Sequence, residues 1–258
     1  MRTIKLDACT ARPFGSYLKA LGVLRLVAEQ ADSAARGCWD GDTFTLESTL
    51  SREDLLRFFL DRYEPTPIVA PWNGGSGFYP KDNKEGIDAI AGCQDARFAE
   101  YRTTIAACRE IPEVQSGKSG DEDERRAAIL RHCRNRLPDR AVEWLDAAVG
   151  IAADGSRSFA PVLGTGGNEG RLDYTNNFMS RIAALLISPD RKTPVHELLA
   201  NALLGDRTTA LQTGAAGQYD PGRAGGANQG PGVEHGCVTN PWDLVLTLEG
   251  AVAWASGL

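Results

Sequence analysis

Hydrophobic and polar residues alternate near the start of the chain, over residues 3–9. This period of two predicts a first strand. The residues on its apolar face are Ile4, Leu6 and Ala8. Apolar residues then recur at helical spacing from Ser16 to about Ala31, and Ser16 is placed to cap that helix.

The next segments mix short apolar runs with helical patterns. Residues 43–47 are expected to form a short strand, and residues 68–70 a buried one. Between them, Ser51 and Asp54 have the spacing of a capping box and predict a helix through Tyr63. From residue 83 to residue 150 the pattern is almost entirely helical. An acidic start and a basic end within residues 121–137 complement the dipole of one such helix.

The last third of the chain predicts one more strand and three more helices. The strand covers residues 159–163, and Asp173 or Thr175 caps the helix after it. The residues expected on that helix's buried face are Phe178, Ile182 and Leu185. A shorter helix covers residues 195–204, and Asn240 with Pro241 begins the last one.

The elements together predict an α+β fold that is predominantly helical, with a few short strands. We expect one domain over residues 1–258, with a helical insertion at about residues 83–150. The last helix is still apolar at Val252, Ala253 and Trp254, and nothing obvious covers its far side. This favours an N-terminal portion of a longer protein, the alternative being a natural terminus that is docked on the core.

Three loops rich in glycine and asparagine stand out from this framework. They cover residues 71–79 (PWNGGSGFY), residues 163–171 (LGTGGNEGR) and residues 214–232, where seven of nineteen residues are glycine. Glycine permits positive φ and close backbone approach to another molecule, and amide side chains donate and accept hydrogen bonds. Such loops suit contact with nucleic acid, and we expect them to form one surface.

Charge and apolar content limit the classes of function. The net charge is −6, whereas a protein that holds nucleic acid unaided is usually basic. Local basic residues or basic partner subunits would therefore have to supply the positive charge. The start of the chain is unlike a signal peptide and no apolar stretch reaches the ~20 residues of a membrane span, so we expect a cytoplasmic protein with no membrane contact.

Catalytic and cofactor motifs are not found in the sequence. Lys118 follows a glycine as in a phosphate-binding loop, but Pro112 stands where that motif needs its first glycine. Residues 163–170 miss the dinucleotide-binding spacing by one residue. The chain has only three histidines, and its six cysteines include no C-x-x-C pair. We therefore expect no enzyme activity, no cofactor and no metal.

The candidate nucleic-acid-binding residues are the polar and basic side chains of the three loops and of the segments beside them. They are Asn73, Ser76, Lys81, Asn83, Lys84, Asn168, Arg171, Asn176, Asn177, Arg181, Gln218, Arg223, Asn228 and Gln229. Asn176 and Asn177 fall in the first turn of a predicted helix, where backbone N–H groups favour an anion. The aromatic residues of the first loop, Trp72, Phe78 and Tyr79, either stack on bases or anchor the loop in the core, and we favour anchoring. Each asparagine can equally serve to hold its loop in shape.

Four long motifs carry a resemblance to a known family. They are PTPIVAPWNGGSGFYPKD, LGTGGNEGRLDYTNNFM, GQYDPGRAGGANQGPG and NPWDLVLTLEGA, and the opening RPFGSYLKALGVLRLVAEQAD also fits. In this order they resemble the large subunit of the type I-G (formerly I-U) CRISPR effector complex, from about residue 10 to the end. Chains of that family are longer, and their C-terminal helical part would be absent here.

The resemblance implies a non-catalytic subunit of an RNA-guided surveillance complex. Its partners would be a guide RNA, the backbone subunits, target duplex DNA and a separately recruited helicase-nuclease. The large subunit would recognise the PAM, help assembly and begin R-loop formation, while guide pairing reads the sequence. Two alternatives stay open: an enzyme that cradles a nucleotide or sugar phosphate in the glycine loops, and a purely structural subunit that bridges partners.

Overall fold

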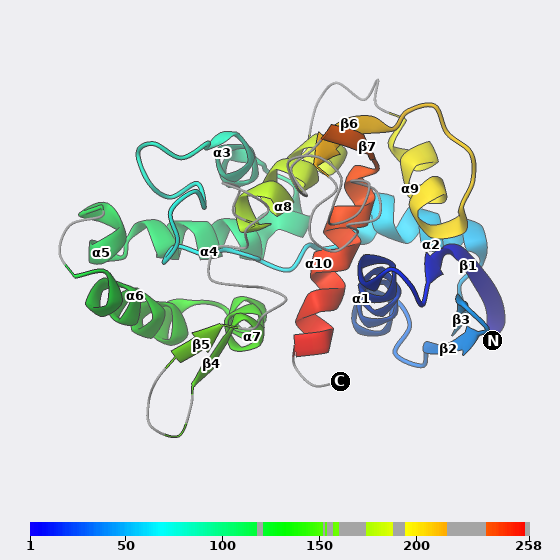
Figure 1. Cartoon of the computed structure of the whole chain (residues 1–258), viewed down its shortest axis with the longest axis horizontal. Coiled ribbons are helices and arrows are strands. Elements are labelled where there is room, and N and C mark those ends of the chain that lie inside the picture. The colour runs from blue at the N-terminus through cyan, green and yellow to red at the C-terminus, as the bar shows by residue number, and fades with distance from the viewer. Residues whose placement is uncertain are drawn as a thin grey trace, which may run out of the picture. The chain divides into compact units, whose positions relative to one another are not determined.

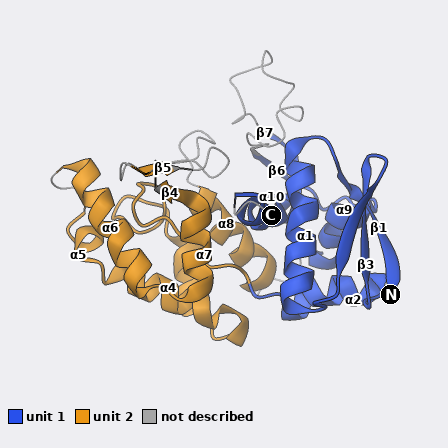
Figure 2. Cartoon of the chain, turned by 90° about the horizontal axis from the view of Figure 1, so that it is seen from below, with its two compact units in different colours: residues 1–64, 188–258 blue, residues 65–187 orange. Residues whose placement is uncertain are grey.

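The computed structural model describes residues 1–117, 121–151, 153, 157–159, 174–187, 194–215 and 236–255. The fold is α+β and predominantly helical, with a few short antiparallel sheets, which confirms the predicted class. The chain divides into two compact units, shown in blue and orange in Figure 2. Unit 1 contains residues 1–64 and 188–258, and unit 2 contains residues 65–187.

Unit 1 is built on a three-stranded antiparallel sheet. Its strands are β1 (Arg2–Thr10), β2 (Arg36–Asp40) and β3 (Thr43–Ser48), in the order β1-β3-β2. Ile4 lies opposite Leu46 and Leu6 opposite Phe44, and all four side chains are buried. The register then shifts between Leu6 and Thr10. This irregularity buries Cys9 instead of Ala8, so the predicted apolar face was correct only as far as Leu6.

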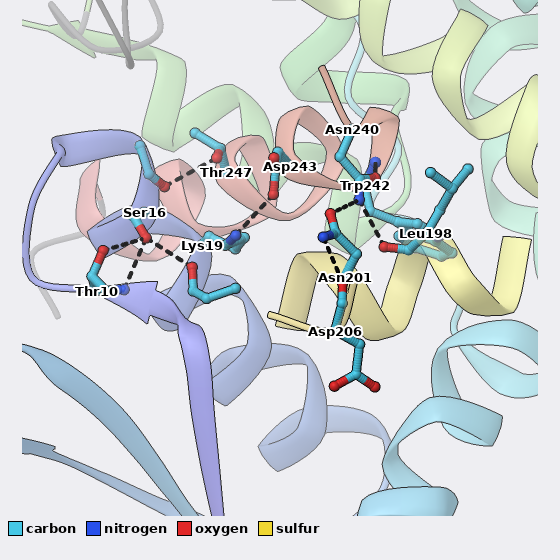
Figure 3. Close-up of polar contacts among 12 residues, drawn as sticks. Thr10, Ser16, Lys19, Leu198, Asn201, Asp206, Asn240, Trp242, Asp243 and Thr247 are labelled. Atoms are coloured by element: carbon cyan, nitrogen blue, oxygen red, sulfur yellow. Dashed lines mark hydrogen bonds and ion pairs between the residues drawn. The ribbon is translucent and has the colours of Figure 1, made fainter. Parts of the chain in front are cut away.

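Ser16 lies inside the first helix and not at its cap. Helix α1 spans Phe14–Gln30, and Pro13 is its N-cap residue. The Ser16 hydroxyl accepts a hydrogen bond from Thr10 N (2.8 Å) and donates one to Ala8 O (3.0 Å), as Figure 3 shows. The side chain that was predicted to start the helix therefore joins the helix to the irregular end of β1.

Helices α1 and α10 lie side by side in unit 1 (Figure 1). Helix α10 spans Pro241–Ala255, and Trp242 N donates to Asn240 Oδ1 (3.1 Å), which confirms the predicted cap. The two helices approach closely at glycines. A Cβ atom added to Gly22 would lie 2.3 Å from Leu246 O, and one added to Gly250 would lie 1.8 Å from Leu18 O. Any side chain at either position would force the helices apart.

Two ion pairs join the same helices. Lys19 Nζ donates to Asp243 Oδ1 at 2.8 Å (Figure 3). Arg25 pairs with Glu249, whose other oxygen accepts from the hydroxyl of Tyr63. Glu249 is fully buried, and both of its carboxylate oxygens have a partner in the core.

The C-terminal end of α10 is more covered than the sequence suggested. Val252 and Ala253 are buried, whereas Trp254 is 40% exposed. The expectation that nothing covers this stretch was therefore wrong for two of its three apolar residues.

The remaining described elements of unit 1 are helical, apart from one two-stranded antiparallel sheet. They are α2 (Arg52–Arg57), a π-helical turn η1 (Phe58–Arg62), α9 (Val195–Leu204), β6 (Gln212–Ala215) and β7 (Gly236–Thr239). The capping box of Ser51 and Asp54 is present as predicted. Asn240 Nδ2 donates to Leu198 O (2.7 Å) and to Asn201 Oδ1 (2.9 Å), which ties the start of α10 to α9 (Figure 3).

Unit 2 is mostly helical, as the sequence predicted for residues 83–150. Its described elements are α3 (Glu85–Gly92), η2 (Ala96–Phe98), α4 (Ala99–Arg109), α5 (Pro112–Gln115), α6 (Glu122–Arg136), α7 (Asp139–Ala148), β4 (Val149–Ile151), β5 (Arg157–Phe159), α8 (Tyr174–Ile182) and a π-helical turn η3 (Ala183–Ile187). Strand β5 starts two residues before the predicted segment 159–163, of which residues 160–163 lie outside the described residues.

Residues 68–70 are buried as predicted but form no strand. The carbonyls of Ile68 and Val69 accept hydrogen bonds from side chains, and that of Ala70 accepts one from Asn73 N (2.9 Å). Tyr101 of α4 donates from its hydroxyl to Ile68 O, and Trp144 of α7 donates from Nε1 to Val69 O, both at 2.6 Å. The two aromatic side chains and Asn73 N satisfy the buried carbonyls, so the segment needs no sheet partner.

Helix α8 begins at Tyr174. Thr175 therefore lies inside the helix and is not its cap, while Asp173 lies outside the described residues. Phe178, Ile182 and Leu185 are buried, which confirms the predicted apolar face.

Candidate nucleic-acid interface

The first glycine loop, residues 71–79 of unit 2, is organised by one carboxylate that follows it. Asp82 accepts hydrogen bonds from three backbone N–H groups, those of Gly75 (2.9 Å), Gly77 (3.0 Å) and Tyr79 (3.1 Å). Gly75 and Gly77 have φ values of 87° and 94°, a region that favours glycine. The loop therefore curls around the Asp82 carboxylate, whose charge the converging N–H dipoles stabilise.

The polar side chains of this loop are buried. Asn73 and Ser76 are buried, and Ser76 Oγ donates to Asn73 O at 2.7 Å. The Tyr79 hydroxyl donates to Pro71 O (2.6 Å) and accepts from Arg125 Nη1 of α6 (2.7 Å). These contacts bond Tyr79, at the end of the loop, to Pro71 at its start and to Arg125 of α6.

Tyr79 and Arg125 form a second anchor for the loop. The guanidinium of Arg125 lies 5.6 Å from the centroid of the Tyr79 ring, within the range of a cation–π contact. Burial raises the pKa of the Tyr79 hydroxyl above its ordinary value, and the charge of Arg125 acts in the opposite direction. Trp72, Phe78 and Tyr79 are all buried, which confirms that the loop aromatics anchor it in the core.

Asn176 of helix α8 also holds the loop in place. Its amide nitrogen donates to Gly75 O (2.8 Å) and to Asn83 O (3.0 Å), and the residue is only 9% exposed. Helix α3 is close enough to α8 that a Cβ atom on Gly86 would lie 2.5 Å from Ser180 N. Asn176 thus serves as a tie between α8 and the loop.

Three of the candidate residues face solvent beside the loop. Lys81, Asn83 and Lys84 are exposed, and Asn83 Oδ1 accepts from Glu85 N (2.9 Å) at the start of α3. Within the part of the chain that the structure describes, neither lysine has a hydrogen-bond or ion-pair partner. Their ammonium groups are available to a ligand, whereas Asn73 is buried and the amide nitrogen of Asn176 is bonded to the loop backbone.

The other candidates lie elsewhere on α8 or outside the described residues. Asn177 and Arg181 are half-buried on α8. The candidates of the second and third loops lie outside the described residues: Asn168, Arg171, Gln218, Arg223, Asn228 and Gln229. The expectation that the three loops form one surface therefore stays a prediction.

Sequence reasoning did not identify Asp82, Arg125 or the internal use of Asn176. A signal for Asp82 was present, since Asp side chains commonly accept hydrogen bonds from backbone N–H groups of nearby turns. No local signal points to Arg125, which is 46 residues from Tyr79.

The described ranges contain neither a metal-binding cluster nor a membrane-spanning helix. No cluster of three His, Cys, Asp or Glu side chains there could hold a metal ion. None of the helices there is both long enough and apolar enough to cross a membrane.

The comparisons with known proteins add no assignment. A scan against protein-family models and a search of curated proteins found no match to the chain.

Proposed function

We propose that this chain is a non-catalytic subunit of an RNA-guided CRISPR surveillance complex, corresponding to the N-terminal portion of the large subunit of type I-G. In the cytoplasm it works with a guide RNA, the backbone subunits and a recruited helicase-nuclease. Its task is to engage duplex DNA at the PAM, to help assembly and to start strand separation. The resemblance of the four motifs supports the family.

The observation that carries the nucleic-acid role is the ordered first loop. Directly after the loop, Lys81 and Lys84 face solvent on a backbone that Asp82, Asn176 and Arg125 hold in place. Cations on a pre-ordered backbone bind phosphate without a large ordering cost. The net charge of −6 fits a subunit that shares its ligand with partners and does not hold DNA alone.

The test is reconstitution of the complex with and without this chain. Guide RNA and partner subunits are expected to co-purify with the tagged chain, and the complex should bind PAM-containing duplex more tightly than duplex with an altered PAM. Omission of the chain should remove that preference. If the complex without it keeps the same preference, the proposal is wrong.

The same experiment separates the two alternatives. Failure of the partners to assemble without the chain, with PAM preference unaffected by changes in its loops, would favour a bridging subunit. A nucleotide or sugar phosphate that raises the melting temperature of the isolated chain would favour the enzyme.

A further inference from the structure

We infer that the segment directly after the first loop, residues 80–84, contacts the sugar–phosphate backbone of the bound nucleic acid through Lys81 and Lys84, and that neither this segment nor the loop reads a base. The inference rests on the proposed function and makes it more specific. It assigns to this segment a positioning role, and it places base readout on other residues.

Base readout needs side chains with free hydrogen-bonding edges. Asn and Gln read a base by presenting the amide oxygen and nitrogen together. Asn73 is 4% exposed, and the amide nitrogen of Asn176 already donates to two backbone carbonyls. Asn83 is exposed, but its oxygen accepts from the backbone at the start of α3. The loop therefore presents no amide with both groups free.

The aromatic side chains of this loop also cannot stack on bases. Trp72 and Tyr79 are each 2% exposed and Phe78 is 8% exposed. Base stacking on a protein requires an accessible ring face. These rings instead pack in the core of unit 2, so they cannot serve as a platform.

The two lysines are the exposed cations of the segment that follows the loop. A lysine ammonium is a compact charge that binds phosphate oxygens but has no shape that distinguishes bases. Asp82 lies between the lysines in sequence, and its carboxylate is directed to the three N–H groups of the loop. The acidic residue therefore orders the backbone that presents the two cations.

Phosphate contacts and base contacts respond differently to salt and to sequence. Each phosphate that a protein neutralises contributes about −0.9 to the slope of log K against log salt concentration on duplex DNA. Loss of both lysines should reduce that slope by about 1.8 in magnitude. Affinity should fall by the same factor for every duplex, because no base contact is lost.

The experiment measures duplex binding by the assembled complex across a series of KCl concentrations. The double variant Lys81→Gln/Lys84→Gln is compared with wild type on a PAM-containing duplex and on one with an altered PAM. The matched control is Arg131→Gln/Arg136→Gln, which removes two exposed charges of α6 that have no ion-pair partner among the described residues. We expect a smaller slope for the lysine variant alone, with the ratio between the two duplexes unchanged.

Several outcomes would overturn the inference. An unchanged slope in the lysine variant, or an equal change in the arginine control, would remove the specific phosphate contact. A changed ratio between the duplexes would show that the loop reads bases. Loss of assembly in the lysine variant would place the lysines against a partner subunit. A wild-type complex that binds no duplex would instead overturn the proposed function, and this inference with it.

Discussion

Individual carboxylates in this chain hold loops in place by accepting several backbone hydrogen bonds at once. Asp82 does so for the first glycine loop, and Asp32 does so at the end of β3 in unit 1. Neither requires a cation as its main partner. A carboxylate that accepts several N–H or O–H groups fixes the positions of those donors, so the geometry of each loop depends on its carboxylate.

The change Asp82→Asn tests the role of this residue in the loop. The neutral amide keeps one acceptor oxygen and places an NH₂ group against backbone N–H donors. Because hydrogen bonds to a charged group contribute roughly 1.5–3 kcal/mol, we expect a loss of about 2 kcal/mol in the free energy of unfolding. Urea denaturation measures the change. Asp88→Asn is the control, since Asp88 pairs with Arg109 at the surface (2.5 Å) and such pairs contribute less than about 1 kcal/mol. Equal losses in the two variants would contradict the assignment.

Asp32 makes stability depend on pH in the acid range. Its carboxylate accepts from Thr49 N (2.6 Å) and from the hydroxyls of Ser48 (2.7 Å) and Thr49 (2.9 Å). The N–H of Thr49, followed by the Ser48 hydroxyl, lowers the pKa of Asp32 well below its ordinary value. A lowered pKa in the folded state stabilises the fold above the unfolded pKa of about 3.9, and this stabilisation is lost as the pH falls below it.

The matching prediction is that Asp32→Asn flattens the acid limb of the stability profile. The free energy of unfolding, measured by urea titration from about pH 5 downward, should fall less steeply in the variant than in wild type. Asp40→Asn is the control, because Asp40 is an exposed carboxylate of β2 to which the described residues donate no hydrogen bond. An acid limb as steep as that of wild type in Asp32→Asn would show that the hydrogen bonds to Asp32 do not set the pH dependence.

At the scale of elements, the packing of α1 against α10 organises unit 1. Two glycines permit the close approach, and Lys19–Asp243 and Arg25–Glu249 fix how the helices align. Buried ion pairs of this kind contribute little net stability, but each member is costly to lose alone. The contact therefore relies on small residues for closeness and on charges for alignment.

Gly250→Ala is expected to destabilise unit 1. The added methyl group would lie 1.8 Å from Leu18 O, and that backbone atom cannot move without displacing α1. Overpacking of this kind costs about 1–3 kcal/mol or more. Gly92→Ala is the control, because a methyl group added there, at the end of α3, would have no neighbouring atom within 4 Å. That change should be neutral or stabilise by up to about 1 kcal/mol. A similar melting temperature for both variants would contradict the close-packing argument.

The elements that sequence could predict are those whose signals are local. The capping box at Ser51, the Asn240 cap and the apolar face of α8 each follow from residues a few positions apart, and all three are present. Strand β2 was missed because Arg-Gly-Cys-Trp-Asp has no apolar alternation, and its partner β3 supplies the pairing. Residues 68–70 were predicted as a strand because their apolar run does not reveal that two distant side chains, Tyr101 and Trp144, satisfy the carbonyls.

The site was predictable in position but not in detail. The glycines marked a loop with unusual backbone geometry, and two of them do adopt positive φ. The asparagines looked like ligand-binding groups, because a sequence does not show whether an amide faces solvent or a neighbouring carbonyl. Asn176 donates to Gly75 O and Asn83 O, which lie about a hundred residues earlier in the chain. Only the folded arrangement of α8 beside the loop determines that use.

At the scale of the whole molecule, the chain path differs between the units. Unit 2 is one continuous segment, residues 65–187, whereas unit 1 is completed by residues 188–258. Unit 2 also has a core of its own, in which Tyr101, Trp144, Phe98 and Phe178 are almost fully buried. A continuous segment with its own core has the properties of an independent folding unit.

We therefore expect residues 65–187 to fold when expressed alone. The fragment should show a helical circular-dichroism spectrum and a single cooperative thermal transition, because the ties from α4 and α7 to residues 68–70 and from α8 to the first loop lie within it. Residues 1–64 alone are the contrast, since they lack α10, which supplies Glu249 to Arg25 and the Gly250 contact to α1. They should show no cooperative transition. A non-cooperative melt of the 65–187 fragment would show that unit 2 is not an independent folding unit.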